Sequence, residues 1–252
     1  MPHAQQPDTN NPSSGRRSDA GQIRLQPRDV TGLLTLAEHY AAPYDLLAAR
    51  TATTEARLRA IVARWRKAGL AATGQLTQGP WWCWLTPQGM RHTGHQWDAA
   101  PPPLAHLAHI RAVLACRNWL ETGQAWQDGQ ATWTPDRQIR QDRPATGPRG
   151  HLPDAEATWP SIPESPRAGE QWAIEVELTP KAHARTQAIM AGLLQGPYDH
   201  VLYLCSTAAL NVVTHAAAQF QQPGQPARVI IRQVPPAALM PTPATRKSSS
   251  RQ

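Results

Sequence analysis

The first third of the chain repeats apolar residues with the period of an α-helix. Three helices are predicted: one opened by Pro27, a short one from Pro43, and one from a Thr53 or Thr54 cap to Lys67, with Gly69 as its stop. The first of these has apolar residues at the i, i+3, i+4, i+7 spacing of an amphipathic helix. These residues are Val30, Leu33, Leu34 and Ala37. The pattern therefore predicts a small helical unit before residue 70.

The third predicted helix carries the most information about function. One narrow apolar stripe runs along it and consists of Leu58, Ile61, Val62 and Trp65. At about 100° per residue, arginines line both borders of the stripe, and small residues with one lysine lie opposite it. The border residues are Arg57, Arg59, Arg64 and Arg66, and the opposite face holds Ala60, Ala63 and Lys67. Such a helix can enter the major groove of DNA while its edges contact phosphates.

Two short apolar segments, 70–72 and 81–85, follow this helix and predict a hairpin with a Gln-Gly-Pro turn. A helix of this kind followed by a hairpin is typical of a winged helix-turn-helix, which we assign to residues 23–97. The alternative is a solvated basic helix in a small bundle.

A second folded block is predicted over residues 102–234, after a run of three prolines. It starts with an amphipathic helix over 104–120, and the stretches 123–150 and 159–169 are expected to be loops. Strands and helices then alternate, which predicts an α/β domain with a mixed sheet and a parallel pair of strands. The predicted strands are 171–178, 199–205 and 228–233, and the helices are 181–194 and 208–220. The polar segments 1–22 and 235–252 are predicted to be a disordered arm and a disordered basic tail.

The balance of basic and acidic residues indicates which class of molecule this protein binds. The chain has 25 Lys and Arg against 18 Asp and Glu, and all but three of the basic residues are arginine. Because arginine binds phosphate in a planar, two-pronged way, this balance favours double-stranded DNA as the partner. A GC-rich coding sequence would produce part of the same bias. Arginines at 137, 140, 143 and 149 add either phosphate contacts or a solvated charged loop.

The sequence pattern excludes several other classes of protein. No segment approaches the roughly 18 consecutive apolar residues of a membrane span, and no secretion signal is recognisable at the N-terminus. The three cysteines are widely spaced, so no disulfide framework is expected. We therefore expect a cytoplasmic protein without a membrane partner.

Acidic residues give the second block its candidate chemistry. In the strand 171–178, Glu175 and Glu177 share one face, and Asp154 comes from a segment about twenty residues earlier. Three carboxylates that converge would suit Mg²⁺, which supports hydrolysis of phosphodiesters by activating water. Lys181, expected on the first turn of the next helix, would offset the developing charge. The alternative is structural: Glu177 pairs with an arginine and Asp154 caps a turn.

Pro153-Asp154, a gap, and then Glu175-Val-Glu177 resemble the PD-(D/E)xK motif of restriction-endonuclease-like folds. The resemblance implies Asp154 and Glu175 as metal ligands. It places the usual lysine at position 177, where this chain has Glu, so either Lys181 takes that role or cleavage has been lost.

The order of the segments is similar to that of the actinobacterial replication-relaxation proteins. It consists of the predicted winged helix, Gly150-His-Leu-Pro-Asp154, the strand from Trp172 to Lys181, and Tyr198-Asp199. The resemblance covers about residues 25–232 and implies a DNA-binding protein of plasmids or mobile elements, acting in replication, relaxation or mobilisation. Plasmid replication or conjugation proteins, and a second copy of the chain, are the partners it implies. Three functions remain open: a DNA-binding protein that cleaves slowly or not at all, an active Mg²⁺-dependent endonuclease or nickase, and a winged-helix transcriptional regulator.

Overall fold

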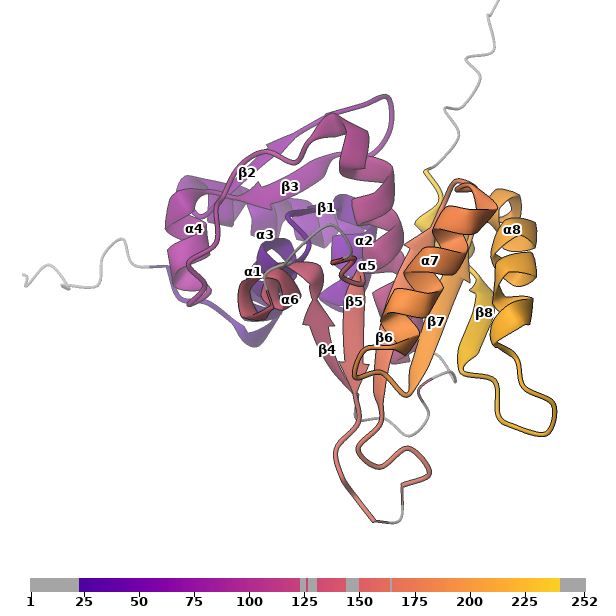
Figure 1. Ribbon diagram of the computed structural model, residues 1–252. Helices are drawn as coiled ribbons and strands as arrows, with labels where there is room; N and C mark the ends of the chain where they lie inside the picture. The colour runs from indigo at the N-terminus through magenta and orange to yellow at the C-terminus, as the bar shows by residue number, and fades with distance from the viewer. Residues whose placement is uncertain (1–22, 123–125, 127–130, 144–149, 164, 241–252) are drawn as a thin grey trace, which may run out of the picture.

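The computed structural model describes residues 23–122, 126, 131–143, 150–163 and 165–240, and combines helices with two β-sheets (Figure 1). Predictions for residues 1–22, for Arg149 and for 241–252 concern positions outside this described part.

The first block contains four helices and a small antiparallel sheet. Strand β3 lies in the middle of that sheet, with β1 and β2 on either side of it. In chain order the elements are α1 (Pro27–Glu38), β1 (Ala41–Pro43), α2 (Tyr44–Arg50), α3 (Glu55–Lys67), β2 (Ala71–Gly74), β3 (Trp82–Leu85) and α4 (Pro87–His92). The three predicted helices and the predicted hairpin are therefore present, and β1 is an additional strand.

The second block is built on a five-stranded mixed sheet in the order β4-β5-β6-β7-β8. The pairs β4–β5 and β5–β6 are antiparallel, and β6–β7 and β7–β8 are parallel. The strands are β4 (Thr132–Pro135), β5 (Ala155–Thr158), β6 (Gln171–Glu177), β7 (His200–Cys205) and β8 (Val229–Gln233). The helices are η1 (Leu104–His106), α5 (Leu107–Thr122), α6 (Asp136–Asp142), α7 (His183–Leu194), α8 (Thr207–Ala217), η3 (Ala218–Phe220) and η4 (Pro236–Ala238). The predicted α/β class, with a mixed sheet that contains parallel strands, is confirmed.

Helices cover both faces of this sheet (Figure 1). On one face, Ile174 and Val176 pack in a core that includes α5, and on the other, Ala173 and Tyr203 pack in a core with α7 and α8. The first of these cores continues into α1, α2 and α3. One hydrophobic core therefore joins the two blocks that we separated at the proline run.

Four details of the sequence-based predictions are wrong. Val30 is 45% exposed, because α1 turns Gly32, Leu33, Leu36 and Ala37 inward instead. Gly32 is on this inward face, and a Cβ there would lie 2.5 Å from the Trp65 ring, so the glycine lets α3 pack closely against α1.

The second error concerns Lys181, which lies in the connection before α7 and not on the helix. Ser206 holds this connection in place, because its backbone N–H donates to Glu177 O (2.8 Å) and its hydroxyl donates to Leu178 O (2.7 Å). Helix α7 begins at His183, two residues after Lys181.

The other two errors are segments expected to lack regular structure. The stretch 123–150 contains β4 and α6. Residues 235–240 are also described: η4 packs on α5, and Arg111 Nε donates to Leu239 O at 3.0 Å. Both segments are poor in long apolar runs, so only their partners in the sheet and on α5 give them order.

Candidate functional site

Helix α3 presents a basic surface to solvent. Its predicted apolar stripe is buried, and the Thr54 hydroxyl caps its first turn by accepting from the Arg57 N–H. The predicted flanking and outward residues are all exposed: Arg57, Arg59, Ala60, Ala63, Arg64, Arg66 and Lys67. The structure therefore brings all seven to one solvent-facing side of a single helix.

Two of the four arginines have acidic partners. Arg64 binds the carboxylate of Asp29, which is fully buried, and Arg59 binds Glu55 one turn earlier on the helix. A hollow of about 270 Å³ lies where α1 begins beside α3, and Arg28, Arg57 and Arg64 line it. The positive surface of α3 thus continues onto the start of α1.

The register of the second sheet brings Asp154 and Glu175 together. Ala155 pairs with Ile174 across β5 and β6, so Asp154 comes opposite Glu175. The Val176 N–H donates to Asp154 Oδ2 at 2.8 Å and fixes that carboxylate beside β6. Two of the carboxylates singled out in the sequence therefore lie near one another, Asp154 directly before β5 and Glu175 on β6.

Two histidines contact these carboxylates, and sequence reasoning gave neither a role. Nε2 of His109, on α5, lies 2.9 Å from Asp154 Oδ1, and Nε2 of His151 lies 2.9 Å from Glu175 Oε1. The sequence feature that could have identified His151 as part of this site is its place three residues before Asp154 in the same short segment. His109 lies 45 residues away, so only the fold brings it near.

The charges of this acidic cluster, which we define as Asp154, Glu175, His109 and His151, are strongly coupled. Burial and then the nearby charge of Asp154 raise the pKa of Glu175 to about 7, against the opposing effect of His151. The hydrogen bond and charge of Glu175 raise the pKa of His151. Burial works against protonation of His109, but Asp154 outweighs it and the pKa of His109 is raised. The cluster therefore attracts positive charge.

Glu177 and Lys181 lie beside the cluster and bind one another. Glu177 is 5% exposed and points to the same face of β6 as Glu175. The positive charge of Lys181 also lowers the pKa of Glu175. Lys181 is thus close to the acids, and the expected arginine partner of Glu177 is replaced by this lysine.

A buried hydroxyl adds to this face of the sheet. Tyr203 pairs with Glu175 across β6 and β7 and is 1% exposed. Its Oη has no hydrogen-bond partner among the described residues. Burial and the charges of Glu175 and Glu177 raise the pKa of Tyr203.

The arginines predicted after residue 136 divide between structural and surface roles. Arg137 is 8% exposed on α6, where it donates to Ala37 O (2.8 Å) and Asp98 O (2.6 Å). Arg143 binds Glu156, and Arg140 contacts Asp136 at 3.3 Å. Arg137 is therefore a residue of the core and not of a solvated loop.

Among the described residues, no group of three or more His, Cys, Asp or Glu side chains is arranged to hold a metal ion. Within the same residues, no helix is long and apolar enough to cross a membrane. The chain matches none of the protein-family models, curated proteins or solved structures with which we compared it.

Proposed function

We propose that this chain is a DNA-binding protein of the plasmid or mobile-element type, acting in replication, relaxation or mobilisation. In this proposal residues 23–97 are a winged helix-turn-helix, and α3 is the helix that enters the major groove of duplex DNA. The observation that carries the proposal is the exposed face of α3, with arginines along both edges and small residues between them.

The arrangement of the first block supports this assignment. Helix, strand, two helices and two strands follow one another, and the last two strands form a hairpin beside β1. The connection between β2 and β3 would serve as the wing, and it carries Trp81, which is 48% exposed. The hollow lined by Arg28, Arg57 and Arg64 gives a phosphate contact at the edge of the same surface.

The test compares two pairs of arginines that differ only in position. Arg57→Ala with Arg66→Ala removes two charges from α3, and Arg185→Ala with Arg232→Ala removes two exposed charges from α7 and β8. Fluorescence anisotropy with a labelled duplex, over a range of salt, measures both affinity and its salt dependence.

We expect the α3 pair to weaken binding at least tenfold and to lower the slope of log Kd against log salt by about two, since each lost phosphate contact removes about one unit. The control pair should retain wild-type affinity. Equal losses in both pairs would show that net charge, and not the surface of α3, holds the DNA, and would contradict the proposal.

We propose as a second function the Mg²⁺-dependent cleavage of phosphodiesters in a restriction-endonuclease-like domain. The specific observation is that Asp154, directly before β5, lies near Glu175 on β6, and that the charge of Lys181 also acts on Glu175. Two close carboxylates repel one another in a buried place, and a divalent cation would relieve that repulsion. Two carboxylates are also a donor set that Mg²⁺ accepts, with water and a phosphate completing its shell.

Asp154 and Glu175 would hold the ion, which supplies an activated water and polarises the phosphate when bound. The Val176 N–H keeps Asp154 in place, and His151 orients Glu175. Lys181 carries the positive charge that would stabilise the phosphate as its charge increases, a role that Glu177 cannot perform at the usual lysine position.

A plasmid nicking assay tests this second function. We expect supercoiled plasmid to be nicked in Mg²⁺, and nicking to be lost in Asp154→Ala and Glu175→Ala but kept in the control Asp142→Ala on α6. Absence of nicking by the wild-type protein, under conditions where it binds the plasmid, would overturn the enzymatic proposal and leave the DNA-binding one.

A further inference from the structure

The β2–β3 hairpin, which is the proposed wing, carries no charge of its own. Between Lys67, at the end of α3, and Arg91, on α4, the chain has no acidic or basic residue. The exposed side chains of the connection between the strands include Gln75, Thr77 and Gln78, which form hydrogen bonds but neutralise no phosphate. Any phosphate beside this wing must therefore be neutralised by basic side chains from another part of the chain.

The hairpin lies beside one arginine edge of α3. Helix α3 packs against β2, and the Tyr44 N–H, at the start of α2, donates to Trp81 O at 2.9 Å. Burial raises the pKa of Tyr44, and the charges of Arg66 and Arg59 act in the opposite direction. Burial also raises the pKa of Cys83, on β3, against the charge of Arg66. The hairpin therefore continues the Arg59 and Arg66 edge of the proposed DNA surface.

The described part of the chain ends beside the same hairpin. Met240 and Leu76, from the connection between β2 and β3, pack against one small apolar cluster. A Cβ added at Gly79, in the same connection, would lie 3.9 Å from the Met240 methyl group. Arg111, on α5, holds this end by donating from Nε to Leu239 O at 3.0 Å. Residue 241 therefore starts next to the proposed wing.

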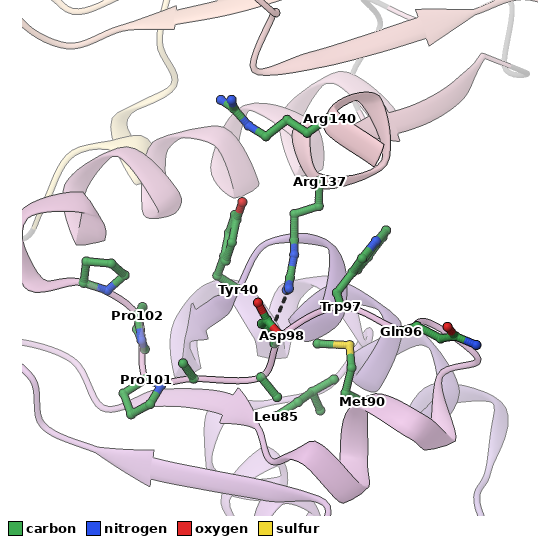
Figure 2. Close-up of a pocket in the computed structure, with 13 residues that line it drawn as sticks. Tyr40, Leu85, Met90, Gln96, Trp97, Asp98, Pro101, Pro102, Arg137 and Arg140 are labelled. Carbon is green, nitrogen blue, oxygen red and sulfur yellow. Dashed lines mark hydrogen bonds between the residues drawn. The ribbon is translucent and has the colours of Figure 1, made fainter. Parts of the chain in front are cut away.

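Arg137 joins the block that carries the C-terminal end to the block that carries the hairpin. A hollow of about 490 Å³ lies between these blocks, and residues of both line it, among them Tyr40, Leu85, Met90, Trp97 and Arg137. From α6, Arg137 donates to Ala37 O, and its guanidinium lies between the Tyr40 and Trp97 rings (Figure 2). The second block, and with it the C-terminal end, is therefore held in place relative to the hairpin.

The residues after Met240, which we call the C-terminal segment (241–252), are basic. They include Arg246, Lys247 and Arg251, and the chain has no acidic residue after Asp199. Six residues lead from Met240 to Arg246, and six fully extended residues span at most about 20 Å. Arg246 and Lys247 are therefore within reach of a duplex that contacts both α3 and the hairpin.

We propose that the C-terminal segment contacts the phosphate backbone of duplex DNA beside the wing and supplies the positive charge that the wing lacks. The inference rests on the proposed DNA binding by α3 and adds a second contact to it. Contacts to phosphates position a protein on DNA but read no bases. The segment should therefore add affinity and salt dependence without adding sequence preference.

The experiment removes two charges from the C-terminal segment and returns two charges to the wing. Arg246→Ser with Lys247→Ser is the first change, and Thr77→Lys with Gln78→Lys, at exposed positions of the connection, is the second. Fluorescence anisotropy with a labelled duplex, over a range of salt, measures the affinity. The melting temperature of each variant checks that the fold is kept.

A control adds the same two charges far from the wing. Ala188→Lys on α7 and Gln195→Lys directly after it are both at exposed positions. Helix α7 covers the face of the second sheet that is turned away from the core shared with the first block. The control therefore matches the change in net charge but not its place.

We expect the loss of Arg246 and Lys247 to weaken binding about tenfold and to lower the slope of log Kd against log salt by about two. Lysines at 77 and 78 should restore both quantities in that variant, and lysines at 188 and 195 should not. Equal recovery with both added pairs would show that only net charge matters. No recovery from the wing lysines would place the contact elsewhere on the duplex, and either result overturns the inference.

Other outcomes separate this inference from the proposed function. A wild-type protein that binds no duplex overturns both. Weaker binding after Arg57→Ala with Arg66→Ala, but unchanged affinity after the loss of Arg246 and Lys247, overturns the inference alone. Tighter binding after that loss would show that the segment covers the surface of α3. Unchanged DNA affinity with segment-dependent binding to vesicles of anionic phospholipid would assign the charges to a lipid surface, and both results also contradict the inference.

Discussion

Asp29 connects two helices of the first block through one buried carboxylate. It accepts from the Gln26 N–H at the start of α1 (2.7 Å), from the indole N–H of Trp65 (3.0 Å) and from Arg64 on α3. A buried charge is tolerated only when it is paired and hydrogen-bonded, as Asp29 is. One of the four arginines on the proposed DNA surface therefore also holds α3 in place against α1.

His39 is the second buried polar residue of this region, and it predicts a pH dependence of stability. It is 4% exposed, and its Nε2 lies 3.1 Å from the Arg117 guanidinium, which donates to it. Burial, followed by the charges of Arg117 and Arg50, lowers the pKa of His39 well below its ordinary value.

The unfolded chain therefore takes up a proton at His39 below about pH 6.5, and the folded protein does not. The contribution of neutral His39 to the stability of the folded protein is complete well above pH 6.5 and is lost as the pH falls. Between pH 7.5 and 5.5 we expect wild type to lose about 1 kcal/mol relative to His39→Gln, which keeps an acceptor for Arg117 but does not titrate. Urea unfolding at both pH values measures the difference, and a constant gap between the two proteins would contradict it.

Helix α4 lies close to the backbone just before β2. An added Cβ at Gly89 would come 1.9 Å from Leu70 O. The Thr86 hydroxyl caps the helix by accepting from the Gly89 N–H at 3.0 Å. Helix α4 also provides Met90 to the hollow between the blocks, so its close approach to β2 sets one wall of that space.

The same substitution should have opposite effects on two helices. Gly89→Ala should destabilise the protein by about 1–3 kcal/mol, because backbone must move to accommodate the methyl group. Gly192→Ala on α7, where nothing lies within 4 Å of the added Cβ, should stabilise it by about 0.5–1 kcal/mol through helix propensity. Thermal and urea unfolding compare the two, and a Gly89→Ala protein as stable as wild type would show that α4 can move without cost.

For the whole molecule, α5 is the helix that packs against both blocks. It is buried along most of its length, and its arginines reach into the first block: Arg111 binds Asp45 and Arg117 binds Glu38. Its apolar residues share one core with both α3 and β6. Neither block would keep this core closed if the other unfolded.

The reactivity of the three cysteines measures whether the two blocks unfold together. Cys83 lies on β3, Cys116 on α5 and Cys205 on β7, and all are buried. Because a buried thiol reacts only when its surroundings open, we expect all three to become reactive at the same urea concentration. Thiol labelling with mass spectrometry measures each site, and earlier labelling of Cys83 than of Cys205 would show that the first block unfolds separately.

Periodic and strongly apolar segments determined their own structure. The stripe of α3, its Thr54 cap and the alternation of β6 followed from sequence because local spacing places those side chains on one face. The same spacing placed Arg57, Arg59, Arg64 and Arg66 on the exposed borders of α3, and put Glu175 and Glu177 on a common side of β6.

The contacts between segments that are distant along the chain were decided only by the tertiary structure. Strand β5, helix α6 and the core that joins the two blocks depend on partners that no local pattern specifies. The pairing of Asp154 with His109, and the hollow beside Tyr40, bring together residues from segments far apart in sequence. Periodicity fixes the face on which a side chain lies, whereas strand register and helix packing determine which faces meet.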